Sequence, residues 1–335
     1  FVAYTKRAME IDQDQAVMVS ADKVVVSDFM GNIVEHPKTY TVDWDASAAE
    51  KGGWDSFMDK EIHEDPAAVQ RTLLGRLDKD GNINLDEIRI DEHEVKAIDK
   101  IIVIACGTAA YAGMVAKYAI EHWVRIPVEV ELAHEFRYRD PILTPRTLVV
   151  AISQSGETMD TLMALRHARE QGSKVLAICN TQGASIPRES DAVLYTHAGP
   201  EVAVASTKAF VAQITAAYVL GLYLAQVKGA MYRDEIAQTL DSLKDMPRKI
   251  QWVLDTQTKT VQEAAKQMVD AKSFLFLGRH VGYPVAMEGA LKLKEIAYTF
   301  TEGFAAGELK HGPIALFDGG EPVVFIVPPA RGRNV

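Results

Sequence analysis

The sequence predicts an α/β protein with two doubly wound parallel sheets, the second one truncated, preceded by a smaller β-rich segment. From residue 101 onward, short and continuously apolar runs alternate with helical stretches, which is typical of parallel sheets covered by helices on both faces. A second, similar alternation begins near residue 265. The first 60 residues hold short β-rich runs without helices between them, so we expect them to form a separate group.

Length and composition restrict the class of function. A chain of 335 residues exceeds one ordinary core, so two or more domains are expected. Because the net charge is −10 and no basic block occurs, we expect no general binding to nucleic acid. No apolar run reaches the ~18 residues of a membrane span and no signal peptide opens the chain, so we expect no membrane partner. Cys106 and Cys179 stand far apart, which predicts buried thiols in a reducing cytoplasm.

The β-rich start of the chain is followed by a helical and then a polar stretch. The β-rich runs lie at 16–20, 23–26 and 38–42, with a hairpin signal at Met30-Gly31-Asn32. The polar stretch that begins at Asp78 has part of the spacing of a calcium loop. Its sixth position should be Gly and is Ile83, and its twelfth should be Glu and is Arg89. We therefore predict an interdomain linker rather than a calcium site.

Five apolar runs predict the strands of the first parallel sheet. They lie at 101–105, 128–132, 147–152, 174–179 and 192–195. The second copy repeats the order of strand, loop, helix and strand. The segments that correspond are 273–278 with 100–107, a helix over 286–300 with a helix over 111–123, and 322–327 with 148–152. Between the copies, residues 233–270 predict long helices that break at Met246-Pro247.

The loop after the third predicted strand has the composition of an anion site. Backbone N–H groups at a helix N-terminus point at an anion, hydroxyls add neutral donors, and Gly156 lets the backbone approach the ligand closely. An ordinary turn with a serine cap is the alternative. Four donor side chains within six residues favour the phosphate site over that alternative. They are Ser153, Gln154, Ser155 and Thr158.

Glu288, Lys292 and Glu295 share one face of a predicted helix, because they stand at positions i, i+4 and i+7. On spacing alone, a solvated row of ion pairs worth ~0.5 kcal/mol is the favoured interpretation. The small residues at 289–290 allow close helix packing, and the leucines around them indicate that the helix is largely buried. A carboxylate held near a substrate serves proton transfer, so the residues alone leave both interpretations open.

Five motifs follow one another along the chain. They are Cys106-Gly-Thr108, Ser153-Gln-Ser-Gly-Glu-Thr158, Val204-Ala-Ser-Thr-Lys-Ala-Phe210, Glu288-Gly-Ala-Leu-Lys-Leu-Lys-Glu295 and Gly307-Glu-Leu-Lys-His-Gly-Pro313. In this order they closely resemble the isomerising glutamine–fructose-6-phosphate aminotransferase family, in which a glutaminase domain with an N-terminal nucleophile precedes two sugar isomerase (SIS) domains. The resemblance implies a domain order. It is a glutaminase remnant at 1–62, a linker at 63–90, the first SIS domain at 91–232, a helical connector at 233–262 and the truncated second SIS domain at 263–335.

The resemblance also implies the reaction and the roles of individual residues. The family converts fructose-6-phosphate and glutamine into glucosamine-6-phosphate and glutamate, the first step of amino-sugar biosynthesis. By this resemblance, Glu295 is the base at C1 and C2, with Glu288 and Lys292 beside it. His311 opens the sugar ring from the neighbouring subunit, so a homodimer is the smallest active form. The residues implied to hold the substrate are Thr108, Ser153, Gln154, Ser155 and Thr158, with backbone groups of Val204 and Ala205.

The family's glutaminase nucleophile is an N-terminal cysteine, and its Schiff-base lysine lies in a C-terminal tail. We therefore expect this chain, which begins at Phe1, to be part of a longer protein that uses glutamine through its glutaminase portion. The sequence has no metal-ligand spacing and no dinucleotide motif, so we expect neither metal nor cofactor. One alternative is a regulator that binds sugar phosphates without catalysis, which has no use for the base Glu295. The other is an isomerase without amidotransfer, which has no use for residues 1–60.

Overall fold

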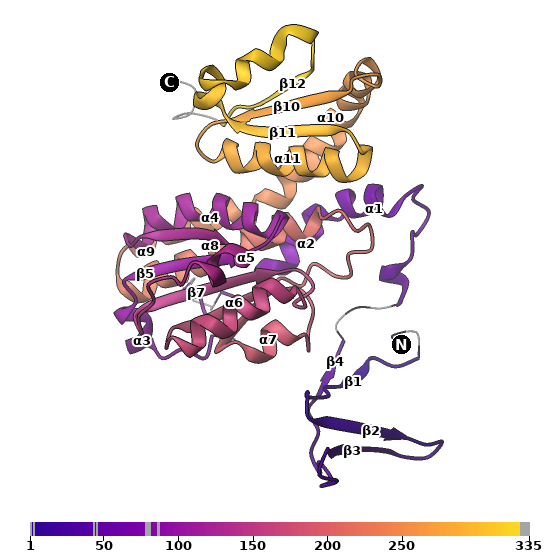
Figure 1. Ribbon diagram of the computed structural model, residues 1–335, viewed down its shortest axis with the longest axis vertical. Coiled ribbons are helices and arrows are strands. Elements are labelled where there is room, and N and C mark those ends of the chain that lie inside the picture. Colours follow the sequence, from indigo (N-terminus) through magenta and orange to yellow (C-terminus); the bar gives the residue numbers. More distant parts are fainter. Residues whose placement is uncertain are drawn as a thin grey trace. The chain divides into compact units, whose positions relative to one another are not determined.

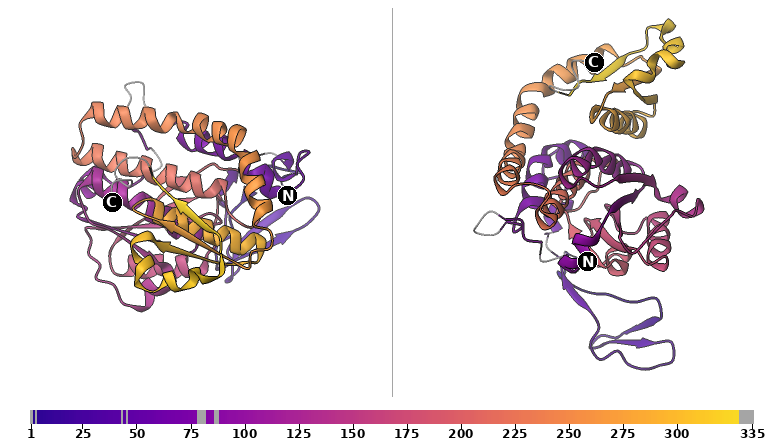
Figure 2. Two further views of the ribbon diagram at one scale, coloured as in Figure 1. Left: turned by 90° about the horizontal axis from the view of Figure 1, so that it is seen from above. Right: turned by 90° about the vertical axis from the view of Figure 1, so that its left-hand side faces the viewer.

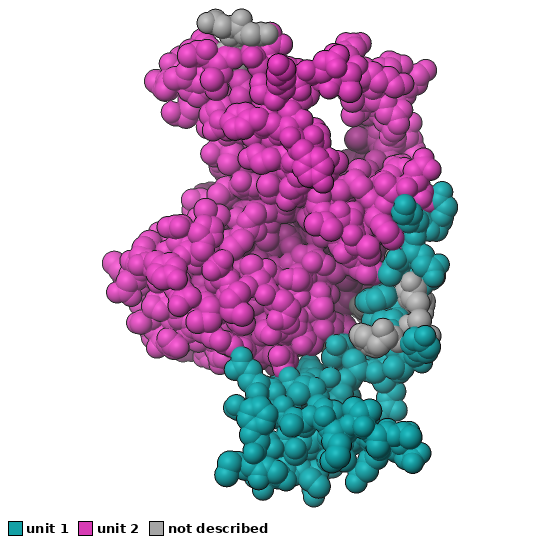
Figure 3. Space-filling model, turned by 45° about the vertical axis from the view of Figure 1, so that its right-hand side comes forward, with its two compact units in different colours: residues 1–53 teal, residues 54–335 magenta. Residues whose placement is uncertain are grey.

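The computed structural model describes residues 2–328 except residues 3, 43, 45, 78–81 and 86–87. The chain divides into two compact units, residues 1–53 and residues 54–335 (Figure 3). Part of the polar stretch that resembles a calcium loop lies outside the described residues. Each unit is described by itself.

The first unit is built from two antiparallel strand pairs, as its β-rich composition predicts. Strand β1 (Arg7–Met9) pairs with β4 (Thr39–Thr41), and β2 (Gln15–Val19) pairs with β3 (Val24–Asp28). The predicted turn signal after β3 is a turn in the structure, because Asp28 Oδ1 accepts the N–H groups of Met30 at 2.9 Å and Asn32 at 2.8 Å. A short 3₁₀ helix, η1 (Ala46–Ala49), follows β4.

The first sheet of the second unit contains the five predicted strands, all of them parallel. They are β5 (Lys100–Ala105), β6 (Val128–Leu132), β7 (Thr147–Ser153), β8 (Lys174–Cys179) and β9 (Ala192–Tyr195). Their order in the sheet is β6-β5-β7-β8-β9, so the chain winds outward in both directions from the centre. This arrangement confirms the doubly wound parallel sheet that the apolar runs predict.

Helices cover both faces of this sheet (Figure 1). Ile101 and Val103 of β5 enter a core shared with α4 (Thr108–Val124) and α8 (Lys208–Lys228). Ile102 and Ile104 enter the opposite core, because successive strand residues point to opposite faces. The helices of that second core are α5 (Ala133–Tyr138), α6 (Met159–Glu170) and α7 (Ser185–Glu189). Helix α3 (Glu92–Ala97), which precedes β5 in the chain, begins with a capping box on Asp91.

Helix α8 is long and strongly apolar. By length and composition it is one helix that could cross a membrane, with a mean hydropathy of 1.5. The same apolarity suits its place in the core, where 61% of the apolar window is buried against the first sheet and α4. The sequence did not predict a helix of this character, because polar residues interrupt its apolar run.

Described residues of the predicted linker at 63–90 pack against the first α/β core. Helix α1 (Phe57–His63) is followed by α2 (Asp65–Leu73), which lies against α8. Ile83 and Leu85 are buried in the same core as α8. Gln226 of α8 accepts the Ile83 N–H at 3.0 Å and donates to the Ile83 carbonyl at 2.9 Å. The stretch is therefore anchored to the core, whereas the domain boundaries stay a prediction.

Two long helices follow the first sheet, as the sequence predicts. Helix α9 (Arg233–Lys244) ends at Asp245, and α10 (Met246–Gln267) begins with Pro247 in its first turn. Proline is tolerated there because the first N–H groups of a helix have no partner within the helix. The break at Met246-Pro247 is confirmed.

The second sheet repeats the topology around β5. Strand β10 (Ser273–Gly278) lies between β11 (Phe300–Ala305) and β12 (Val323–Ile326), and both pairs are parallel. Helix α11 (Gly282–Ala297) covers one face of these strands (Figure 2). Two 3₁₀ segments, η2 (Ala306–His311) and η3 (Pro313–Gly319), connect β11 to β12.

Both predicted boundaries of this helix are wrong, and α11 begins at Gly282, four residues before the predicted start. The helix was expected to run from 286 to 300, yet α11 ends at Ala297 and Phe300 is the first residue of β11. Tyr298 adopts a left-handed conformation with φ of 53°, which ends the helix. Phe300 then pairs with Ser273 of β10, so strand pairing decides the state of a segment whose apolar period alone fits a helix.

Close packing of α4 against α8 predicts the effect of one substitution. A Cβ at Gly221 would lie 2.8 Å from Ile120 Cγ1 and 3.3 Å from Trp123 Cε3. We expect Gly221→Ala to destabilise the protein by about 1–3 kcal/mol through overpacking. Urea unfolding measures this change. Intrinsic propensity alone gives the opposite sign, because Ala in a helix is favoured over Gly, so a stabilised variant would contradict the packing argument.

Candidate active site

A cavity of about 200 Å³ lies at the carboxyl ends of β5 and β7. In open parallel sheets, ligands bind at this edge. The cavity brings together six of the seven predicted substrate-binding residues, and four more polar or sulfur-bearing side chains that were not predicted. Its lining consists of Cys106, Thr108, Ala109, Ile152, Ser153, Gln154, Ser155, Thr158, Glu201, Val204, Ser206 and Gln213. The seventh predicted residue, Ala205, follows Val204 directly and is buried.

The loop from Ser153 to Thr158 is held in shape by its own hydroxyls. Ser153 Oγ accepts the Gly156 N–H at 3.1 Å and lies 3.0 Å from Thr158 Oγ1. Ser155 Oγ accepts the Glu157 N–H at 3.2 Å. Thr158 is the N-cap of α6, and its side chain makes no capping hydrogen bond. The first-turn N–H groups of α6 therefore do not have a capping oxygen from Thr158, which suits the binding of an anion.

Gly156 is required in this loop for two separate reasons. Its φ of +69° lies in the region that residues with a Cβ rarely adopt. A Cβ at this position would also lie 2.6 Å from Ala184 Cβ and 2.7 Å from Cys179 Sγ. The loop is thus packed directly onto the last residue of β8 and the chain that follows it.

Thr108 joins the cavity to helix α11. Its hydroxyl donates to Glu288 Oε1 at 3.0 Å and accepts from Lys292 Nζ at 3.0 Å. Lys292 Nζ also lies 3.5 Å from Glu288 Oε1 and 2.6 Å from Glu295 Oε2. Glu288, Lys292 and Glu295 therefore form ion pairs, as their spacing predicts. The row is not solvated along its whole length, because Glu288 and Lys292 contact Thr108, which lines the cavity.

The two carboxylates of this row, Glu288 and Glu295, differ in how far they are buried. Glu288 is 5% exposed, and burial raises its pKa to about 7, against the opposing effects of Lys292 and of the Thr108 hydrogen bond. Glu288 Oε2 is buried without a hydrogen-bond partner among the described atoms. The Glu295 side chain is 40% exposed. A carboxyl group that titrates near pH 7 suits general acid–base chemistry, so Glu288 is a candidate equal to the predicted base Glu295.

His311 stands apart from these residues within one chain. It is the last residue of η2, its side chain is exposed, and within the described ranges no hydrogen bond or ion pair joins it to Thr108, Glu288, Lys292 or Glu295. The role that the resemblance implies for His311, acting across a subunit interface, therefore stays a prediction.

Glu201, Ser206 and Gln213 line the cavity although the sequence did not single them out as site residues. Glu201 Oε1 accepts hydrogen bonds from Ser206 Oγ at 3.2 Å, the Thr207 N–H at 3.1 Å and the Ala209 N–H at 3.2 Å. Burial raises the pKa of Glu201, although these donors oppose the shift. The adjacent hydroxyl residues at 206–207, directly before an apolar helix, could have indicated this part of the site, since Ser and Thr are favoured at helix N-termini.

The two cysteines differ in burial, so the expectation that both thiols are buried is wrong for Cys106. Cys179 is buried and burial raises its pKa to about 12. Cys106 is only half-buried, because it follows the last residue of β5 and lines the cavity. Cys106, His134 and Asp160 place atoms able to ligate a metal within 4.8 Å of one another, although His134 and Asp160 are exposed. The sequence spacing gave no sign of this grouping.

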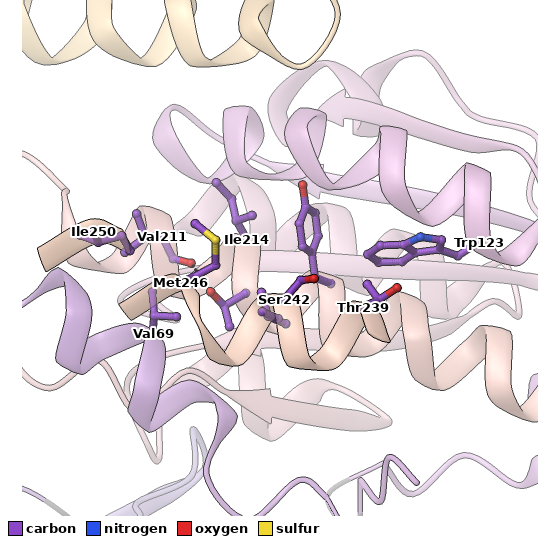
Figure 4. Close-up of a pocket in the computed structure, with 11 residues that line it drawn as sticks. Val69, Trp123, Val211, Ile214, Thr239, Ser242, Met246 and Ile250 are labelled. Carbon is purple, nitrogen blue, oxygen red and sulfur yellow. Dashed lines mark hydrogen bonds between the residues drawn. The ribbon is translucent and has the colours of Figure 1, made fainter. Parts of the chain in front are cut away.

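A larger cavity of about 410 Å³ lies between α2, α4, α8, α9 and α10 (Figure 4). Its lining is apolar apart from the hydroxyl groups of two threonines, one serine and one tyrosine. The residues are Val69, Trp123, Val211, Ile214, Thr215, Tyr218, Thr239, Ser242, Leu243, Met246 and Ile250. No carboxylate, lysine or histidine occurs among them, and no predicted site residue does either. The smaller cavity at the sheet edge is therefore the candidate active site.

A matched pair of glycines tests the packing of the loop. Gly172 has a φ of +86°, and a Cβ added to it would meet no atom within 4 Å, so Gly172→Ala carries only the conformational cost of about 1 kcal/mol. We expect Gly156→Ala to cost about 2–4 kcal/mol, because a clash is added to a similar conformational cost. Denaturant unfolding of both variants measures the difference. Equal losses would show that the contact with Ala184 and Cys179 is unimportant.

The raised pKa of Glu288 predicts a pH dependence of stability. Between pH 4.5 and 7 the folded state keeps a proton that the unfolded state has lost, so this group's contribution to stability falls as the pH rises. We expect the unfolding free energy of the wild type minus that of Glu288→Gln to fall by up to about 3 kcal/mol across this range. Urea unfolding at several pH values measures it.

The subtraction removes the titrating groups that do not interact with Glu288. Asp65, whose pKa burial also raises to about 7, is present in both proteins and cancels in the difference. A difference that stays level or rises with pH would contradict the raised pKa of Glu288.

Comparison with known proteins gives consistent matches. The glutamine–fructose-6-phosphate aminotransferase (isomerizing) of Corynebacterium efficiens is 67% identical over 334 residues, covering 100% of this chain and 53% of the relative. The enzyme of the same name from Streptomyces coelicolor is 62% identical over 335 residues, covering 100% of this chain and 54% of the relative. The chain thus spans about half the length of the curated relatives it matches.

A solved structure and a family model agree with this match. The C-terminal domain of glucosamine-fructose-6-phosphate aminotransferase from Francisella tularensis has a TM-score of 0.80 and 42% identity, covering 84% of this chain and 78% of that one. A family model of the SIS domain matches residues 95–223 and 267–334. These ranges contain the two parallel sheets and more than half of the sequence. The chain therefore belongs to the SIS-domain family.

Proposed function

We propose that this chain is the sugar-phosphate isomerase part of a cytoplasmic glutamine–fructose-6-phosphate aminotransferase. The whole protein would convert fructose-6-phosphate and glutamine into glucosamine-6-phosphate and glutamate. The names of the relatives that are 67% and 62% identical support these substrates. Glutamine would be used by the glutaminase portion, and the proposal includes no cofactor, nucleic acid or membrane partner.

The observation that carries this proposal is the junction of the phosphate-type loop with the row of acid–base groups. Thr108 lines the cavity together with Ser153 and Ser155, and it bonds to Glu288 and Lys292 of the second sheet's helix. A sugar phosphate anchored on the loop would therefore lie next to carboxylates that are able to move a proton. A regulator that only binds sugar phosphates has no use for such a row.

Each residue of the row has a role in the proposed reaction. Moving hydrogen between C1 and C2 needs a group that takes a proton from one carbon and returns it to the other. We assign this role to Glu295, with Glu288 as the second acid–base group because burial brings its pKa to about 7. Lys292 Nζ lies 2.6 Å from Glu295 Oε2 and offers a cation to a sugar oxygen.

The substrate side uses the loop and the neighbouring turn. Hydroxyls of Ser153, Ser155 and Thr158, the Gln154 side chain and the N-terminus of α6 would hold the phosphate. Thr108 and the backbone of Val204 and Ala205 would contact the sugar.

Ring opening is assigned to His311 of the partner subunit in a homodimer. Within one chain His311 is exposed and separate from the row, which is consistent with action across an interface. Imidazole exchanges protons near neutral pH, as ring opening requires.

The domain order of the proposal follows the resemblance. Residues 1–62 would be the end of the glutaminase domain, 63–90 a linker, 91–232 the first SIS domain, 233–262 the connector and 263–335 the second SIS domain. The family match at 95–223 and 267–334 supports the two SIS segments. The division of the structure at residue 53 supports a separate N-terminal part.

Isothermal titration with fructose-6-phosphate and glucose-6-phosphate tests the proposal. We expect micromolar to millimolar binding by the wild type and a loss of about fivefold or more in Ser155→Ala, because a donor to the phosphate is removed. Ser173→Ala is the control, since Ser173 Oγ donates to the Thr144 carbonyl at 3.1 Å and Ser173 is not among the residues lining the cavity.

Two results would contradict the proposal. One is a folded wild type that binds neither sugar phosphate. The other is binding that Ser155→Ala and Ser173→Ala leave equally strong.

A further inference from the structure

The chain makes a strained turn where Val204 lines the cavity. Val204 has a φ of +70°, a conformation that is rare for any residue except glycine and is an outlier for a β-branched one. The Ala205 N–H donates to the Ala203 carbonyl at 2.9 Å, so residues 203–205 form a γ-turn of the strained, positive-φ kind. Val204 is 95% exposed, so no packing of its side chain accounts for the conformation. Strain of this kind persists only where the surroundings enforce it.

A carboxylate from a distant helix holds the start of this turn. Glu61 lies on α1, is 2% exposed, and its Oε1 accepts the N–H groups of Val202 at 2.6 Å and Ala203 at 3.1 Å. One oxygen thus binds both N–H groups that precede Val204. The two contacts fix the direction in which the chain enters the turn.

Glu201 holds the other end of the turn. Its Oε1 accepts the Thr207 N–H at 3.1 Å and the Ala209 N–H at 3.2 Å, at the start of α8. The backbone is therefore fixed before the turn by Glu61 and after it by Glu201. Residues 204–205 are left between two anchored points at the wall of the cavity.

Stability alone does not account for Glu61. Its second oxygen, Oε2, is buried without a hydrogen-bond partner among the described atoms. A carboxylate that uses only half of its acceptor capacity in the interior carries a desolvation cost, and an apolar side chain at the same place avoids that cost. A role in holding the strained Val204 turn at the cavity wall accounts for a buried carboxylate at position 61 despite its desolvation cost.

We propose that Glu61 is a positioning residue of the sugar-phosphate site, which fixes the Val204 turn against its own strain. This inference rests on the proposed function, because it takes the cavity to be the sugar-phosphate site. The loop from Ser153 to Thr158 supplies the phosphate contacts, and the Val204 turn supplies a separate part of the wall. Loss of Glu61 should therefore weaken the binding of a whole sugar phosphate more than the binding of phosphate alone.

The test compares two ligands across four variants of this chain. Glu61→Met removes the acceptor, Glu61→Asp keeps the charge but draws it back by one methylene, and Glu61→Gln keeps an acceptor oxygen at the same reach. Gln226→Met is the matched control. It removes two side-chain bonds to the backbone of Ile83, and Gln226 lies thirteen residues along α8 from Gln213, about 20 Å from the cavity.

We expect Glu61→Met to raise the Kd for fructose-6-phosphate about tenfold and the Kd for inorganic phosphate less than about twofold. Glu61→Asp should show the same pattern with a smaller effect, and it decides the matter if Glu61→Met does not fold. Glu61→Gln should stay within about twofold of the wild type for both ligands, because one acceptor oxygen suffices. Gln226→Met should change neither Kd, even where it lowers the melting temperature.

Hydrogen exchange supplies a readout of the turn itself. The Val202 and Ala203 amides should exchange faster in Glu61→Met than in Gln226→Met, while the amides of the 153–158 loop stay unchanged. An unchanged Kd for fructose-6-phosphate, or equal losses for the two ligands, would overturn the positioning role. Absence of fructose-6-phosphate binding in the wild type would instead overturn the proposed function.

Discussion

The parallel pairing of β7 with β5 and β8 is the interaction on which both the core and the cavity depend. All seven residues of β7 are buried, and alternate side chains enter the two cores on either face of the sheet. The carboxyl ends of parallel strands meet at one edge, so the loops after β5 and β7 meet there as well. Ser153, which pairs with Cys179 of β8, is both the last residue of the ladder and a polar residue of the cavity wall.

Carboxylates that are buried, as Glu61 and Glu288 are, or half-buried, as Glu201 is, are the second feature of this edge. Glu61 and Glu201 anchor backbone N–H groups around the Val204 turn, and Glu288 receives the Thr108 hydroxyl. Burial of a carboxylate costs several kcal/mol unless donors replace the lost water. The donors to Glu61 and Glu288 come from distant segments, so each of these two carboxylates ties distant parts of the chain together, whereas Glu201 binds donors only five to eight residues further along the chain. Stability and site geometry are therefore linked through the same hydrogen bonds.

Local patterns predicted much of the fold, and the reasons are physical. Buried parallel strands are apolar along their whole length, so the five runs from 101 to 195 mark the five strands of the first sheet. The loop at 153–158 was recognisable because its hydroxyls, its glycine and the helix start are adjacent in the chain. The end of α11 was misplaced, since pairing of Phe300 with β10 is not visible in a local apolar period.

Local sequence patterns cannot predict contacts between residues that are distant in the chain. Glu61 and Val202 are 141 residues apart, and Lys292 and Thr108 are 184 apart, so no spacing rule reveals that they meet. The sequence placed Glu288, Lys292 and Glu295 on one helix face, but it gave no measure of how burial differs between the two carboxylates. That difference sets the pKa of Glu288 and needs the folded chain.

The Thr108 hydroxyl has a single proton, and in this structure it is given to Glu288. A ligand oxygen that needs a donor at Thr108 must therefore compete with Glu288 for that proton. When Thr108 donates to the ligand instead, Glu288 loses a hydrogen bond that stabilises its ionised form, and it becomes a stronger base. Occupation of the cavity and the basicity of Glu288 are thereby connected through one hydroxyl group.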